Sequence, residues 1–117
     1  MKSFIVSLVT IFIITTLIAI NSVAFVWVAD DLIEMAEKAS LDYESVSHLR
    51  SEWEGRRLWL SLTTSGKEID KIDTTLCSIE SIVRNGDEDE FEKEKSLLIY
   101  YIEQMRNDEI LSLDRFF

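Results

Sequence analysis

The feature that most constrains this chain is an uncharged stretch near its start. From Phe4 to Ala29 no residue is charged, and the stretch reads FIVSLVTIFIITTLIAINSVAFVWVA. A bilayer core about 30 Å thick needs roughly 20 apolar helical residues. These 26 residues are therefore enough to span a membrane and to project beyond it by a turn or more. Asn21 and Ser22 interrupt the apolar run, and Trp27 lies near its outer end, where an amphipathic ring suits the membrane interface.

A cleaved signal peptide is the competing interpretation of this stretch. Lys2 would supply its positive charge, and the residues Ser-Val-Ala at positions 22–24 resemble a cleavage site between small residues. The apolar run is longer than a usual signal core and continues through Trp27 beyond that site, which favours an uncleaved anchor over residues 1–29. A lysine before the span predicts a cytoplasmic N-terminus and an extracytoplasmic C-terminal domain, residues 30–117, at the cell membrane.

Charge is distributed very unequally along the chain. All 22 acidic residues and 11 of the 12 basic ones follow the apolar run. Such an acidic domain disfavours nucleic acid and anionic lipid heads as partners. Cys77 is the only cysteine, which excludes an internal disulfide and a metal site of several thiolates. Because Cys77 lies beside an apolar stripe, we expect a partly buried, inert thiol, with a disulfide-linked dimer as the alternative.

The domain after the anchor is predicted to be all-α. The chain has no proline and only three glycines, a composition that favours long helices. Residues 30–39 continue or restart a helix, and Ser-Leu-Asp at positions 40–42 predicts a break, since Ser and Asp are good N-caps. One long helix is then expected over residues 43–84, with Asn85-Gly86 as its stop.

The expected long helix has two apolar stripes that point in different directions. At about 100° per residue, the first stripe consists of Val46, Leu49, Trp53 and Leu60, and the second of Leu62, Ile69, Ile72, Leu76, Ile79 and Val83. We favour a single helix that presents different faces to different partners. The alternative is a bend at residues 63–66, where Thr, Thr, Ser and Gly weaken a helix.

A further helix is expected from the acidic residues 87–90 to Arg106, because carboxylates in a first turn suit the positive end of the helix dipole. Its apolar stripe consists of Phe91, Leu98, Tyr101, Ile102 and Met105. The short connection makes it antiparallel to the long helix. An apolar tail should then reach and cover Trp59; its members are Ile110, Leu111, Leu113, Phe116 and Phe117. The predicted fold is thus an N-terminal transmembrane helix followed by a small antiparallel helical hairpin or three-helix bundle with one long central helix.

Trp53, Arg56, Arg57 and Trp59 are the candidate interaction residues. Six residues of helix turn Trp53 and Trp59 to different sides, so they do not form one aromatic platform. Arg56 and Arg57 follow Trp53 by three and four residues, within reach of a cation–π contact. We favour the alternative that the arginines cover the tryptophan and pair with the neighbouring glutamates. The stretch is then first a packing junction and only secondarily a partner-binding patch.

No metal site is expected. His48 is the only histidine, and although Glu44 and Glu52 lie four residues to either side, this spacing is ordinary for a solvated helix face. The acidic run at residues 87–90 lacks the ordered Asp-x-Asp-x-Asp-Gly spacing of a calcium loop.

No motif indicates catalysis either. Glu68, Asp70 and Asp73 have no nucleophile, base dyad or glycine-rich phosphate loop beside them, and we expect them on a charged outer face. No Gly-x-Ser-x-Gly arrangement occurs among the serines. The sequence therefore predicts a protein that is not an enzyme and has no cofactor.

Five features form a set that extends over nearly the whole chain. They are the N-terminal anchor, Trp53 followed by Trp59, Glu68-Ile69-Asp70 before Ile72, Leu76 and Ile79, the turn Asn85-Gly86-Asp87, and the ending Leu111-Ser112-Leu113-Asp114-Arg115-Phe116-Phe117. Together they resemble an uncharacterised family of short bacterial single-pass membrane proteins, a domain-of-unknown-function family. Arg115 and Phe116 depart from its usual ending, which has a polar and then an aliphatic residue there. The resemblance implies a membrane-tethered helical domain and supplies no catalytic residue.

The expected function is that of a membrane-anchored helical protein of the bacterial cell envelope. It would act through protein–protein interaction or self-association, or as a structural or assembly component, because two apolar faces on one helix exceed what a single short neighbour can cover. The alternative is a ligand- or cation-sensing extracytoplasmic module that holds a small molecule or cation near Trp53, Arg56 and Trp59. Neither nucleic acid nor a small-molecule substrate is expected.

Overall fold

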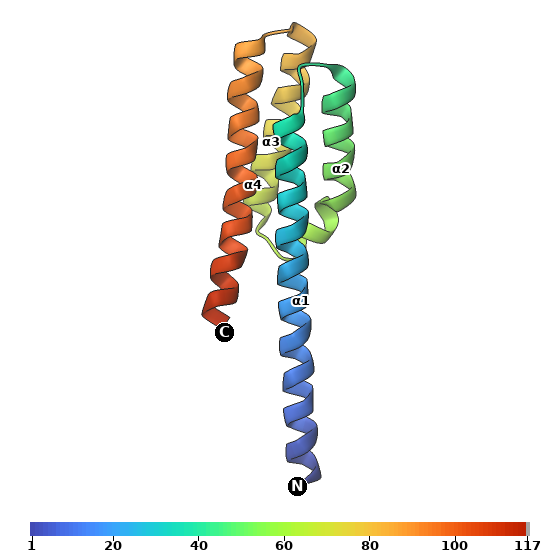
Figure 1. Cartoon of the computed structure of the whole chain (residues 1–117), viewed down its shortest axis with the longest axis vertical. Helices are drawn as coiled ribbons and strands as arrows, with labels where there is room; N and C mark the ends of the chain where they lie inside the picture. The colour runs from blue at the N-terminus through green and yellow to red at the C-terminus, as the bar shows by residue number, and fades with distance from the viewer. Residues whose placement is uncertain (117) are drawn as a thin grey trace.

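The computed structural model describes residues 1–116, which form four α-helices joined by short connections (Figure 1). The helices are α1 (Lys2–Lys38), α2 (Tyr43–Ser61), α3 (Gly66–Asn85) and α4 (Glu88–Phe116). Consecutive helices run antiparallel and pack side by side, and α4 packs back against α1. This closes an up-and-down four-helix bundle. The predicted all-α class and the long apolar N-terminal helix are confirmed.

α1 belongs to the bundle only with its C-terminal half. Most of its N-terminal half projects beyond the other helices, which gives the molecule an elongated shape of 69 × 22 × 22 Å (Figure 1). In the projecting part the large apolar side chains are exposed, for example Phe4, Phe12 and Leu17. Within residues 1–116, α1 is the one helix that is long and apolar enough to cross a membrane, judged by length and composition.

The bundle core begins inside the apolar run. α1 passes residue 29, the expected end of the anchor, without a break. Phe25 and Ala29 have no exposed surface, and Ser22 is also buried. The end of the uncharged stretch, from Ser22 to Ala29, was predicted to belong to the membrane anchor. It packs against the other helices instead.

The expected long central helix is instead two helices, α2 and α3, which is a correction to the predicted fold. α2 ends at Ser61, and the backbone N–H of Thr64 bonds to the carbonyl of Leu60 at 3.0 Å in the turn that follows. The Ser65 hydroxyl then accepts the N–H of Glu68 and caps α3. Ser and Thr bind backbone groups locally, so they favour such a turn over a continuous helix. The bend considered as the alternative was placed at the right residues.

The helix ends follow the sequence signals. Asp42 caps α2 by accepting the N–H of Ser45 at 2.7 Å, and Asp87 accepts the N–H of Glu90 at 3.1 Å at the start of α4. Gly86 ends α3 in the left-handed conformation, with φ of 70°, which glycine adopts without a steric penalty. The breaks predicted at residues 40–42 and 85–86 are confirmed.

The predicted apolar stripes form the core of the bundle with two exceptions. The buried members are Val46, Leu49, Trp53 and Leu60 of α2, Ile69, Ile72, Leu76 and Ile79 of α3, and Phe91, Leu98, Ile102 and Met105 of α4. Val83 and Tyr101 pack against this core and are partly buried. Leu62 is the first exception, because it lies in the turn between α2 and α3 and is 79% exposed.

The C-terminal tail is the second exception. α4 does not close at Asn107 but continues to Phe116, since the intervening residues include no glycine or proline to end a helix. Ile110 and Leu111 are exposed on this extension, 39% and 54% respectively, and are not part of the buried core. Phe117 and the side chains of Leu113 and Phe116, which were also expected to cover Trp59, lie outside the described part of the chain.

Candidate functional site

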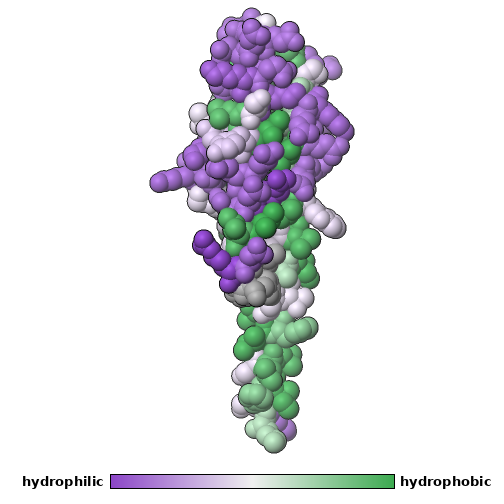
Figure 2. Space-filling model, turned by 60° about the vertical axis from the view of Figure 1, so that its left-hand side comes forward, coloured by the Kyte–Doolittle hydropathy of each residue, from purple (hydrophilic) through white to green (hydrophobic). Residues whose placement is uncertain are grey.

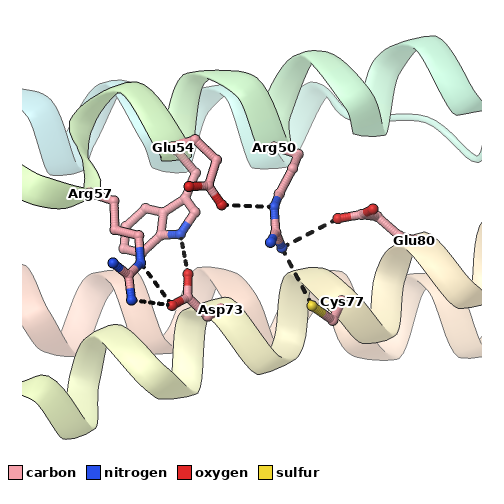
Figure 3. A network of polar contacts seen from close by, with 7 residues as sticks. Arg50, Glu54, Arg57, Asp73, Cys77 and Glu80 are labelled. Carbon is pink, nitrogen blue, oxygen red and sulfur yellow. Dashed lines mark hydrogen bonds and ion pairs between the residues drawn. The ribbon is translucent and has the colours of Figure 1, made fainter.

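Trp53 occupies the interface between α2 and α3. Its side chain is 1% exposed, and its indole Nε1 donates a hydrogen bond of 2.6 Å to Oδ1 of Asp73 on α3 (Figure 3). A buried indole N–H requires an acceptor, because leaving it without one costs the desolvation of the group. Asp73 therefore completes the burial of Trp53.

Asp73 binds a second residue of α2 at the same time. The Nε and Nη2 atoms of Arg57 both lie 2.8 Å from its Oδ2 (Figure 3). Asp73 was expected on a charged outer face, but its side chain is only 23% exposed. Asp73 is largely buried because of the turn between α2 and α3, which makes the two helices antiparallel about Thr63. Trp53 and Asp73, ten positions before and after Thr63, therefore face each other.

A second polar cluster lies on the same interface nearer the far end of the bundle. Arg50 pairs with Glu54 at 3.1 Å and with Glu80 of α3 at 3.3 Å, and its Nη1 lies 3.6 Å from the Sγ of Cys77 (Figure 3). Burial by itself would lower the pKa of Arg50, but the contact with Cys77 and the charges of Glu80 and Glu54 raise the pKa overall. The guanidinium thus stays charged. Cys77 is exposed, which corrects the expected partly buried thiol.

Arg56 connects α2 to α1. It pairs with Glu52 at 2.8 Å, as the favoured interpretation predicted, and also with Asp31 of α1 at 2.9 Å. Arg106 of α4 makes the corresponding contact with Asp30 at 2.6 Å. The acidic pair that follows the apolar run is therefore held by arginines from two different helices. Sequence reasoning missed this role, although two adjacent acidic residues at the end of an apolar run are a signal for it.

No cation–π contact of Arg56 or Arg57 with Trp53 occurs among the described residues, where both arginines bind carboxylates. Cation–π contacts are made instead by Lys71 on Tyr101 at 5.7 Å and by Lys95 on Phe91 at 6.0 Å.

Trp59 packs against α1 and is partly buried. Its ring centroid lies 6.1 Å from that of Phe25, at an interplanar angle of 38°. Among the described side chains, the aromatic partner of Trp59 is thus Phe25 of α1, which was not expected. Phe25 could not be identified from the sequence as the partner, because it lies in a stretch whose composition predicts contact with lipid.

The four candidate residues consequently do not form one site. Trp53 and Arg57 bind Asp73 on α3, whereas Arg56 and Trp59 contact α1. This confirms that the two tryptophans point to different sides of the helix. The stretch from Trp53 to Trp59 is the junction through which α2 is attached to both of its neighbours.

His48 is exposed, as is Glu44, and Glu52 is engaged by Arg56. Among residues 1–116, no three His, Cys, Asp or Glu side chains lie close enough together to hold a metal ion.

The chain belongs to the family defined by the domain of unknown function DUF4363, whose model matches residues 29–115. The match begins in the C-terminal part of α1 and extends through nearly all of α4, so it covers most of the four-helix bundle. This confirms the resemblance to an uncharacterised family. No curated protein and no solved structure matches the chain.

Proposed function

We propose that this is a non-enzymatic single-pass protein of the bacterial cell envelope, in which α1 anchors an extracytoplasmic bundle that interacts with other proteins. The observation that carries this proposal is the continuity of α1. The same helix exposes Phe4, Phe12 and Leu17 in its projecting half and buries Phe25 and Ala29 in the bundle. With no loop between span and bundle, a force or displacement at one is transmitted directly to the other.

The apolar stripes of α2 and α3 are not the contact surface for a partner, because the bundle itself covers them. The candidate surface lies on α1, on the side opposite the bundle. There an open apolar groove is lined by Ala19, Ile20, Val23, Ala24 and Trp27. Trp27 is 73% exposed, and small residues beside it permit a close approach of another helix. A membrane protein of the envelope or a second copy of this chain fits this surface.

Photo-crosslinking in intact cells tests the interaction. A photoreactive residue replaces Trp27, and a matched control places it at Glu92, which is exposed on α4. We expect a discrete crosslinked product from position 27 and none from position 92. A product of twice the monomer mass indicates a second copy, and any other mass is identified by mass spectrometry. Only monomer from both positions would contradict the proposal.

The orientation is tested through Cys77. It is exposed and is the only cysteine of the chain, so a maleimide reagent labels this residue alone. For an extracytoplasmic bundle, we expect a membrane-impermeant maleimide to label intact cells as fully as permeabilised cells. Labelling that requires permeabilisation would place the bundle in the cytoplasm.

The alternative function is that of a ligand- or cation-sensing module. A ligand bound near Trp53 and Arg56 would have to displace the contacts that these residues already make. Trp53 is bonded to Asp73, Arg56 to Glu52 and Asp31. A screen of small molecules and metal ions by thermal denaturation tests this alternative. A concentration-dependent rise in Tm with a change in tryptophan fluorescence would favour it.

A further inference from the structure

Two contacts place separate parts of the bundle at one level of α1. The Asn21 side-chain amide donates to the hydroxyl of Thr63 at 3.4 Å, in the turn between α2 and α3. The neighbouring Ser22 hydroxyl donates to Oε1 of Glu109 on α4 at 2.7 Å. We call this level, at Asn21 and Ser22, the base of the bundle (Figure 1).

Beyond the base, α1 continues toward its N-terminus, with only the end of α4 beside the first turns below the base (Figure 1). Residues 2–21 have a helical length of about 30 Å at 1.5 Å per residue, which equals the thickness of a bilayer hydrocarbon core. If this part of α1 is the membrane span, as the proposed function requires, the base of the bundle lies at the membrane surface.

α4 extends past the base. From Glu109 it continues for seven residues to Phe116, about 10 Å along α1 toward the projecting half. Its last two turns therefore reach the level of the headgroups and the uppermost acyl chains. Because these turns also include the exposed, charged Asp114 and Arg115, those two side chains have to extend back to the headgroups. Three large apolar side chains are exposed at or just below the base, namely Leu62 at 79%, Leu111 at 54% and Ile110 at 39%.

We propose that the base of the bundle docks on the lipid bilayer, with Leu62, Ile110 and Leu111 inserted into the interface. These residues come from the α2–α3 turn and from α4. They lie at about the same height along the axis of α1 and do not belong to one face of a single helix. A planar surface perpendicular to α1 contacts such a set, and the bilayer that surrounds the span is that surface. The projecting part is largely apolar and the distal end is hydrophilic, and at the lower bundle apolar patches lie among hydrophilic side chains (Figure 2).

The position of Trp27 agrees with this placement. It lies six residues after Asn21, about 9 Å farther from the membrane core, and points away from the bundle. An exposed tryptophan at that height lies near the headgroups, where its amphipathic ring is stabilised. The attraction is apolar rather than electrostatic, because the chain has a net charge of −10.

Docking fixes the height and tilt of the bundle. α3 has 20 residues, so the distal turn at Gly86 stands about 30 Å above the membrane. A bundle held at its base presents that end at a constant distance from the bilayer.

Depth-dependent fluorescence quenching tests the docking in the full chain. In a Cys77→Ser background, single cysteines replace Leu62, Leu111, Leu97 or Phe12 and are labelled with an environment-sensitive fluorophore. Leu97 is the matched control, because it is also an exposed leucine of α4 but lies twelve residues before Glu109, about 18 Å above the base. The protein is reconstituted into phosphatidylcholine vesicles that contain lipids with a nitroxide near the headgroup or deep in the acyl chain.

We expect the probes at positions 62 and 111 to be quenched several-fold more strongly than the probe at position 97 by the shallow nitroxide. The probe at position 12 should respond most to the deep nitroxide. Quenching at position 12 together with equal, weak quenching at positions 62, 111 and 97 overturns the docking and leaves the anchor intact. Absence of quenching at position 12 overturns the anchor itself, and the docking with it.

Discussion

Asp73 joins α3 to two residues of α2 at once, Trp53 and Arg57. Replacing it with alanine leaves the buried Trp53 Nε1 without an acceptor and Arg57 without its carboxylate. We expect Asp73→Ala to lower the free energy of unfolding by about 1–3 kcal/mol, measured by urea denaturation. Asp73→Asn retains an acceptor for Trp53 and should cost less. Asp70→Ala, at an exposed position of the same helix, is the control, and equal losses for Asp70→Ala and Asp73→Ala would contradict this role.

Phe25 and Trp27 form a second comparison of single residues. They are two positions apart on α1, but Phe25 is completely buried against Trp59 and the core, whereas Trp27 is 73% exposed. Phe25→Ala should lower the free energy of unfolding by about 3–5 kcal/mol through the lost apolar contacts and the cavity that remains. Trp27→Ala should change it by less than about 0.5 kcal/mol. Both values come from denaturation in the same detergent, and a loss with Trp27→Ala as large as with Phe25→Ala would place the core on the wrong face of α1.

Much of the residue-level pattern could be predicted, and the exceptions have physical causes. The core positions of α2, α3 and α4 follow from helical periodicity alone, because an apolar stripe has to be covered. Asp73 could not be predicted, since its role depends on which residues the turn at Thr63 places opposite each other. Once the turn is known, counting ten residues in each direction pairs Trp53 with Asp73.

At the level of the helices, the effect of a glycine depends on its backbone conformation. Gly86 adopts φ of 70°, which costs a residue with a Cβ about 1–2 kcal/mol, so Gly86→Ala should destabilise the bundle by that amount. Gly55 lies inside α2 with free space around it, so Gly55→Ala should stabilise the protein by about 0.5–1 kcal/mol. Thermal and urea denaturation measure both changes. Shifts of the same sign would show that the connection after α3 does not need a left-handed residue.

The sequence predicts several of the helix boundaries but not the break between α2 and α3 or the end of α4 at Phe116. Asp42, Asp87 and Gly86 are strong local signals for a cap or a stop, and all three positions are confirmed. The residues Thr-Thr-Ser-Gly at positions 63–66 permit either a bend or a complete break. The break forms because antiparallel α2 and α3 can then cover each other's stripes, and this tertiary gain is not visible in local propensity.

For the whole molecule, the principal difference from the sequence-based expectation concerns the function of α1. This helix is long and apolar enough to cross a membrane, and its C-terminal half is also one of the four packed helices of the bundle. Hydropathy does not separate these two roles, because a buried helix face and a lipid-facing one have the same composition. The family match starts at residue 29, yet Phe25 and Ser22 already belong to the packed bundle. The fourth helix of the bundle results from the break between α2 and α3, whereas the first turns of its first helix, from Ser22 to Ala29, lay inside the predicted anchor.

This assignment of α1 predicts where the folded unit begins. A water-soluble fragment of residues 30–117 lacks Phe25 and Ala29, both fully buried, and leaves Trp59 without its aromatic partner. A fragment of residues 21–117 retains these contacts and both bonds of Asn21 and Ser22. We expect the shorter fragment to be less stable by at least the 3–5 kcal/mol of one buried phenylalanine, a large share of the 5–15 kcal/mol typical of a domain. Near-ultraviolet circular dichroism and urea denaturation should show weakened tryptophan packing in the shorter fragment only. Equal stability of the two fragments would mean that the part of α1 before Asp30 is not needed for the bundle to fold, and that it contributes only to the membrane anchor.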